Sequence, residues 1–116
     1  MVENGQIIER QGVKLVFVVP ETAPETVYCR AEIGRIDDGA DEYACARAML
    51  EGNCFWQGTK GGTLGLRGKV AYLTDRRDAS FFEEEGVLEA YAEDMIDTVL
   101  LWRERIETYR LNGEVK

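Results

Sequence analysis

Histidine is absent from this 116-residue chain, and cysteine is scarce. Without histidine, the chain can hold neither a Ser-His-Asp triad nor a Cys-His dyad, and no metal site with imidazole ligands. Its three cysteines, Cys29, Cys45 and Cys54, form no C-x-x-C pair, so the sequence predicts neither a disulfide framework nor a zinc ribbon. We interpret them as small buried apolar residues in a reducing compartment, and we expect no metal and no cofactor.

Long apolar runs and an excess of basic residues are also missing. No run approaches the roughly 20 residues of a membrane span, and the first five residues do not begin a signal peptide. Fourteen Lys and Arg against 22 Asp and Glu give a net charge of −8. Contacts to phosphate dominate the affinity for nucleic acid, so such an acidic chain is a poor candidate for that role. We expect a soluble cytoplasmic protein that binds neither nucleic acid nor membrane.

What is present is the composition of one compact domain over residues 1–116, with 45% hydrophobic and 31% charged residues. Residues 6–9, 13–19 and 27–33 predict three strands with short connections, which is typical of an antiparallel meander. The second strand is apolar on both faces, because Val16 and Val18 alternate with other apolar residues. Its second face is either covered or presents an apolar patch to a partner.

A short helix and a hairpin are predicted next. Asp37-Asp38-Gly39 offers N-caps for a helix over about residues 40–51, and Gly52 is a natural stop. The glycine-rich segment that follows leads into a hairpin with its turn at Gly68. It does not predict a phosphate-binding loop, because Lys60 precedes the glycine pair and a strand, not a helix, follows.

A long helix closes the chain. Ser80 and Glu83 match a capping box, which predicts a helix over about residues 81–110. One apolar seam repeats at steps of four and three residues: Leu88, Ala92, Met95, Val99, Trp102, Ile106 and Tyr109. We expect this seam to cover the sheet, although an intermolecular coiled coil has the same spacing.

Charged side chains gather in two places. Glu89, Glu93 and Asp97 share one face of the long helix, where we interpret them as a solvated surface rather than as catalytic carboxylates. Five bases lie between residues 58 and 80, and they either form a local basic patch or solvate the hairpin: Lys60, Arg67, Lys69, Arg76 and Arg77.

Two segments resemble a known family. Residues 49–66, MLEGNCFWQGTKGGTLGL, resemble the stretch of class I type III secretion chaperones (Tir chaperone-like) in which a Leu-Glu-Ala-Asn helix end runs into a glycine-rich Leu-Gly-Leu strand. Trp102-Arg103 is similar to the Trp-Arg near the end of that family's last helix. The resemblance implies an α+β fold: a twisted antiparallel sheet, made of a three-strand meander and a hairpin, with a short helix and a long C-terminal helix. The family's usual N-terminal helix is expected to be absent here.

The resemblance also implies a function. Members of this family are acidic homodimers without enzymatic activity, which bind the N-terminal segment of a secreted effector and keep it competent for export. By analogy we expect the short helix and the following strand to form the dimer interface, through Tyr43, Arg47, Leu50, Phe55, Trp56, Leu64 and Leu66. Partner binding is expected on the second and third strands, at Val16, Val18 and Tyr28.

Two alternatives remain open. A regulatory adaptor of the same fold would bind a cytosolic protein that is not exported. A small hydrolase using Glu89, Glu93 or Cys54 belongs to a different class, and it requires a deep pocket with convergent polar groups.

Overall fold

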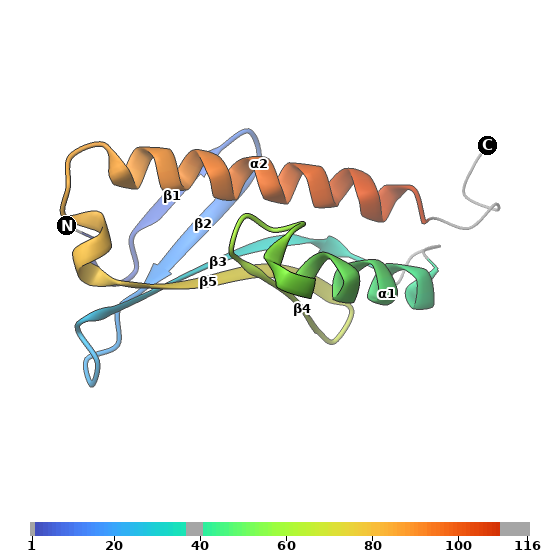
Figure 1. Ribbon diagram of the computed structural model, residues 1–116, viewed down its shortest axis with the longest axis horizontal. Coiled ribbons are helices and arrows are strands. Elements are labelled where there is room, and N and C mark those ends of the chain that lie inside the picture. The colour runs from blue at the N-terminus through green and yellow to red at the C-terminus, as the bar shows by residue number, and fades with distance from the viewer. Residues whose placement is uncertain (1, 37–40, 110–116) are drawn as a thin grey trace.

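A computed structural model describes residues 2–36 and 41–109 of the chain. Its five strands form one antiparallel sheet in the order β1-β2-β3-β5-β4. The strands are β1 (Ile7–Arg10), β2 (Val13–Val18), β3 (Thr26–Arg35), β4 (Thr63–Arg67) and β5 (Val70–Asp78). The helices are α1 (Glu42–Asn53) and α2 (Val87–Glu107), with short 3-10 helices η1 (Cys54–Trp56) and η2 (Ala79–Phe82). In Figure 1, α2 runs along one face of the sheet and α1 lies beside β4.

This architecture confirms the α+β fold expected from the sequence. The meander is β1–β2–β3, and the second hairpin is β4–β5. The β1–β2 and β4–β5 hairpins each turn over two residues and have left-handed backbone at a glycine, which for β4–β5 is the predicted Gly68. Gln11 and Gly12 have φ of 55° and 77°, and Gly68 has φ of 63°. Positive φ at such turns matches the right-handed twist of the flanking strands.

The core lies between α2 and the sheet. The predicted seam faces inward, and its residues from Ala92 to Ile106 are buried against β2 and β3. The inward residues of β2, namely Val13, Leu15 and Phe17, are fully buried. The seam therefore covers the sheet of its own chain, which resolves the choice against a coiled coil.

The Trp102-Arg103 pair anchors the end of α2. The Trp102 indole N–H donates to the Gly58 carbonyl at 2.8 Å. Arg103 donates through its guanidinium to the carbonyls of Ile33 at 2.8 Å, and of Gly12 and Glu32 at 3.1 Å each. Charge-assisted bonds of this kind tie the helix to the meander, because the carbonyls belong to β3 and to the β1–β2 turn.

The predicted start of the long helix is wrong. Ser80 lies in η2, where its amide donates to Asp78, and the chain then bends at Gly86 with φ of 87° before α2 begins at Val87. The S-x-x-E pattern therefore encodes a separate 3-10 turn, in which the Glu83 amide donates to the Ser80 carbonyl. Burial of Phe82 explains the extra bend, because a helix that continued from Ser80 would not turn this ring into the core.

The short helix also differs in detail. Asp41 is its N-cap and accepts a bond from the Ala44 amide at 3.1 Å, whereas Asp37-Asp38-Gly39 lies outside the described residues. Gly52 does not end the helix, which continues to Asn53. Cys29 and Cys45 are buried as expected, but Cys54 is exposed, so that prediction is wrong for one cysteine in three. The cause is the end of α1, where the chain turns away from the core.

Candidate partner-binding surfaces

No helix of the described residues lies on one face of the sheet, and we call this side the open sheet face. Val13, Leu15 and Phe17 alternate inward, so Val16 and Val18 point to this face. Val18 pairs with Tyr28 on β3, and their side chains are 36% and 42% exposed. Val16 is half-buried and lies one row away. The structure thus brings the three predicted partner-binding residues together as one apolar strip.

A second apolar surface lies along α1, η1 and β4, and we call it the α1–β4 patch. Its large side chains are all exposed, from 45% to 78%: Tyr43, Leu50, Phe55, Trp56 and Leu66. These are five of the seven residues predicted for a dimer interface. Contiguous exposed apolar side chains of this size are typical of protein–protein contact sites.

The other two predicted dimer residues lie differently. Arg47 is on the surface of α1, where it donates to Glu51 at 3.2 Å; this bond and one with Tyr43 raise the pKa of its guanidinium. Leu64 is only 4% exposed, because it points under α1 toward Gly52. It belongs to the core of the single chain and is not available on the α1–β4 patch.

Backbone strain marks the centre of this patch. Phe55 and Trp56 have φ of 56° and 57°, a left-handed conformation that residues other than glycine rarely adopt. Each such residue costs roughly 1–2 kcal/mol of folding free energy. Two consecutive aromatic residues are thus held in strained, exposed positions, an arrangement that clusters at functional sites.

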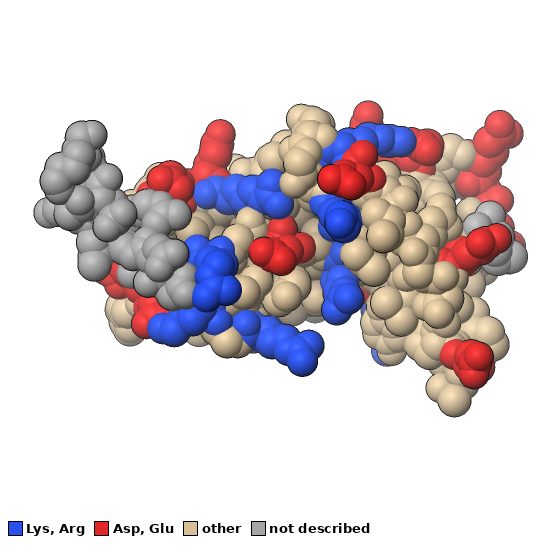
Figure 2. Space-filling view, turned by 180° about the vertical axis from the view of Figure 1, so that it is seen from behind, with Lys and Arg blue, Asp and Glu red and all other residues tan. Residues whose placement is uncertain are grey.

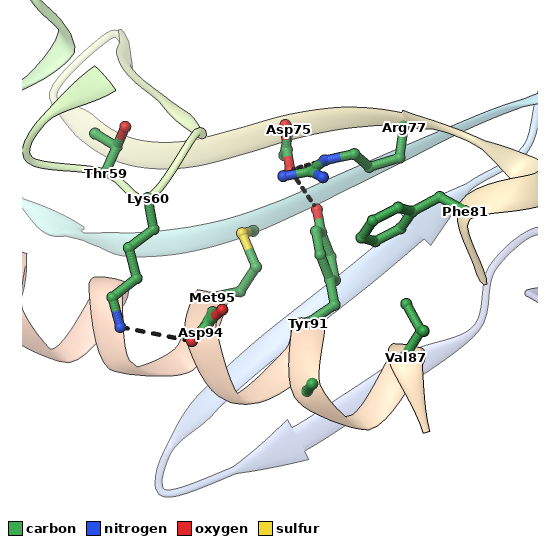
Figure 3. A pocket seen from close by; sticks show the side chains of 10 residues that line it. Thr59, Lys60, Asp75, Arg77, Phe81, Val87, Tyr91, Asp94 and Met95 are labelled. Atoms are coloured by element: carbon green, nitrogen blue, oxygen red, sulfur yellow. Dashed lines mark hydrogen bonds and ion pairs between the residues drawn. The ribbon is translucent and has the colours of Figure 1, made fainter. Parts of the chain in front are cut away.

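A pocket of about 290 Å³ opens between α2 and β5. Figure 3 shows apolar Phe81, Val87 and Met95 around it, together with the ion pair of Lys60 and Asp94, whose N···O distance is 3.5 Å. The sequence does not predict this pocket, because its walls come from segments that only folding brings together. The adjacent aromatic residues Phe81-Phe82 were the one local signal of an aromatic cluster here.

Asp75 organises the polar wall of the pocket. Its carboxylate accepts bonds from the Tyr91 hydroxyl at 2.8 Å, the Arg77 Nε at 3.0 Å and the Arg76 amide at 2.8 Å. The Arg77 guanidinium also lies over the Phe81 ring, 4.7 Å from its centroid. A carboxylate that accepts three fixed donors is suited to holding α2 on β5, not to abstracting protons.

Two buried groups next to Asp75 have raised pKa values. Burial raises the pKa of the Cys29 thiol to about 12, and the nearby Asp75 charge acts in the same direction. Burial likewise raises the pKa of the Tyr91 hydroxyl far above its ordinary value, with smaller contributions from Cys29 and Asp75. Both groups are neutral and protonated at physiological pH, so neither is an activated nucleophile.

The candidate metal ligands among the described residues are Asp, Glu and Cys side chains. No three Asp, Glu or Cys side chains among them lie close enough to hold a metal ion. Glu89 pairs with Arg10 at 2.9 Å on the surface, and Glu93 and Asp97 are exposed, as expected for a solvated face. Over residues 2–36 and 41–109, neither helix combines the length and the apolar character needed to cross a membrane.

One sequence family matches most of the chain. The model of the Tir chaperone protein (CesT) family matches residues 4–103. The chain belongs to this family. The resemblance noted in residues 49–66 and at Trp102-Arg103 is therefore confirmed. The Tir chaperone family is a family of chaperones rather than of enzymes.

Solved structures show the same fold. A chain from the crystal structure of the ExsC-ExsE complex is similar with a TM-score of 0.70 and 15% identity, over 87% of this chain and 74% of that one. A chain from the structure of the HopA1-SchA chaperone-effector complex has a TM-score of 0.60 and 12% identity, over 84% and 73%. No curated protein matches this Tir chaperone family member in sequence.

Proposed function

We propose that this chain is a type III secretion chaperone of class I, which binds the N-terminal segment of a secreted effector and keeps it competent for export. Membership of the Tir chaperone family is the observation that carries the proposal. The two similar structures support it, since one is a chaperone-effector complex. In this role the protein acts in the cytoplasm, without catalysis, on an effector that is still unfolded.

The open sheet face is the proposed client-binding surface. Val16, Val18 and Tyr28 form an apolar strip there, and an extended polypeptide presents every second side chain to one side. Because β2 and β3 are paired on both sides within the sheet, contact with the apolar side chains gives the affinity, and their spacing gives the selectivity. The pocket between α2 and β5 lies on the other, helix-covered side of the sheet, where Phe81, Val87 and Met95 offer a separate anchor for an apolar client residue.

The α1–β4 patch is the proposed homodimer interface. An interface on a two-fold axis uses the same surface of both copies, and the exposed side chains of this patch come from α1 and from β4 and η1, which both contact α1. Exposed Leu50, Phe55 and Trp56 supply the large apolar side chains that dominate such contacts.

Calorimetry tests the client-binding surface. The ligand is the N-terminal segment of the protein that is encoded by the gene next to the gene of this chain. We expect Val18→Asp and Val16→Asp to weaken binding at least about tenfold, because each places a charge in the apolar strip. Leu101→Asp is the matched control: Leu101 is 41% exposed, but it lies on α2, away from the open sheet face. Circular dichroism first shows that each variant is folded.

Two results contradict the proposal at different levels. Wild-type affinity in both valine variants would place the client elsewhere on the molecule. Absence of binding to any extended segment, together with stable binding to a folded cytosolic protein, would favour the regulatory adaptor instead.

A further inference from the structure

A hollow of about 260 Å³ lies on the open sheet face beside the apolar strip. It is lined from three strands: Arg30 of β3, Arg67 and Gly65 of β4, and Tyr72 and Thr74 of β5. The strand register explains why these residues meet. Arg30 pairs with Thr74, and Gly65 pairs with Tyr72, so their side chains share one face of neighbouring rows.

Gly65 keeps the hollow open. A Cβ atom built at this position has no atom within 4 Å, so no described residue fills the space above its backbone. The half-buried Tyr72 supplies an aromatic wall, and Thr74 lies opposite Arg30, where its hydroxyl donates to the Thr63 carbonyl at 3.3 Å. The result is a shallow recess with two guanidinium groups at its sides.

The bases at the hollow are not held in ion pairs by described residues, although Glu32 lies on the same face of β3, two residues from Arg30. Five of the chain's bases make ion pairs within the described residues: Arg10, Arg47, Lys60, Lys69 and Arg77. Arg30, Arg67 and the adjacent Arg76 are exposed and make no ion pair with any described carboxylate. Figure 2 shows Lys and Arg side chains gathered across the middle of one side of this otherwise acidic molecule.

We propose that this hollow binds acidic side chains of the client, so that the client segment alternates apolar residues with Asp or Glu. The inference rests on the proposed chaperone function and adds the chemistry of the segment. Val16 pairs directly with Arg30, and Tyr28 pairs with Arg76, so the apolar strip and the bases are adjacent. A guanidinium binds a carboxylate through two parallel hydrogen bonds, which fixes the position of the segment as well as attracting it.

A peptide suits this surface better than a nucleic acid does. The basic area contains only a few side chains, whereas affinity for nucleic acid requires many phosphate contacts. The net charge of −8 repels a polyanion over the rest of the surface. A peptide in which two or three carboxylates alternate with apolar residues matches both the bases and the apolar strip.

Synthetic octapeptides provide a test that needs no known client. One alternates Val with Glu, and its two controls alternate Val with Gln and Val with Lys. We expect saturable changes in the amide NMR signals of Gly65 and Thr74 with the Glu peptide. Arg30→Ala and Arg67→Ala should each weaken its binding about tenfold, as for a lost charge-assisted bond, and added salt should weaken it further. Arg10→Ala is the matched control, because Arg10 pairs with Glu89 away from the hollow.

Several outcomes would overturn the inference. These are equal binding of the Glu and Gln peptides, unchanged affinity in both arginine variants, and a single-stranded oligonucleotide that binds the hollow more tightly than the Glu peptide. Calorimetry with the client distinguishes a failure of the acidic-side-chain inference from a failure of the proposed chaperone function. A client that binds wild type and both arginine variants equally removes only the acidic preference. If no client binds while the Glu peptide still occupies the hollow, the chaperone function fails and the acidic site stands.

Discussion

At the scale of single residues, the close approach of two backbones explains the glycines around α1. Gly52 faces the Trp102 ring, and a Cβ built on Gly52 would lie 2.8 Å from the Trp102 Cη2 atom. Gly58 faces Gly52 in turn, with 3.1 Å between its added Cβ and the Gly52 Cα. The glycine-rich segment after α1 therefore serves packing against α2, which is why it resembles a phosphate-binding loop only in composition.

Gly52→Ala should destabilise the protein by roughly 1–3 kcal/mol, the usual range for overpacking a core. Alanine normally stabilises a helix by about 1 kcal/mol relative to glycine. Here the contact with a hydrogen-bonded, buried indole outweighs that gain. Urea unfolding measures the difference, and Gly34→Ala is the control, since no atom lies within 4 Å of its added Cβ. Equal stability of both variants would contradict the packing argument.

The buried Cys29 and Tyr91 predict loss of stability at alkaline pH. The pKa of the Cys29 thiol rises from 9.0 to about 12 in the folded chain, and the pKa of Tyr91 rises from 10.0. The folded state therefore retains protons that the unfolded state releases. The stabilisation is complete below about pH 9 and falls above it, by at most about 1.4 kcal/mol per pH unit for each group.

Cys29→Ala should reduce the slope of stability against pH between about pH 9 and 12, and Tyr91→Phe should do so above about pH 10. Thermal unfolding across this range measures the slope. Cys54→Ala removes an exposed thiol and should keep the wild-type profile. An unchanged slope in both buried-site variants would show that other groups control alkaline unfolding.

At the scale of elements, α2 holds the fold together. It contributes eight buried residues, and its Trp102 and Arg103 bind carbonyls from the α1–β4 loop, the β1–β2 turn and β3. Position along the seam therefore decides the effect of a substitution more than residue type does.

Trp102→Ala should lower the free energy of unfolding by about 3–5 kcal/mol, since it empties a buried indole site and leaves the Gly58 carbonyl without its donor. Leu101→Ala, one position earlier and 41% exposed, should lower it by less than about 1 kcal/mol. Denaturant titration of both variants checks the contrast, and similar losses would contradict the assignment of the seam.

Much of this element-scale organisation was predictable from sequence. Periodicity located the sheet, both turns and the seam of α2, because burial imposes it directly on residue order. The bend at Gly86, the exposure of Cys54 and the burial of Leu64 were missed, because each depends on how α1 and η2 pack. The pocket beside Asp75 was missed for the same reason, since Asp75 and Tyr91 meet only in the folded chain.

At the scale of the whole molecule, two apolar surfaces lie on different elements. The apolar strip of the open sheet face belongs to β2 and β3, whereas the α1–β4 patch belongs to α1, η1 and β4. If the first surface binds the client and the second binds another copy of the chain, a substitution on the client-binding surface should leave dimerisation unchanged, and the reverse should also hold.

Light scattering over a micromolar dilution series tests whether two copies of the chain associate. We expect about twice the mass of the 13.1 kDa chain for wild type and for Val18→Asp. Leu50→Asp should shift the mass toward the monomer, because Leu50 is 71% exposed on the patch and a charge there is buried on association. A persistent monomer of wild type would reject the homodimer, and a dimer in Leu50→Asp would place the interface elsewhere.

The side chain of Asn53 has a consequence for solubility. The two-residue turn at Gly68 directs the backbone of Thr63, Gly65 and Arg67 toward β5, so Leu64 and Leu66 direct theirs outward. Asn53 occupies both outward groups of Leu64, accepting from its amide at 2.7 Å and donating to its carbonyl at 2.9 Å. An open strand edge normally invites uncontrolled addition of further strands. Because the Asn53 amide occupies the outward groups of Leu64, the free edge of β4 is limited to Leu66. This edge is too short to seed aggregation through fibril-like growth.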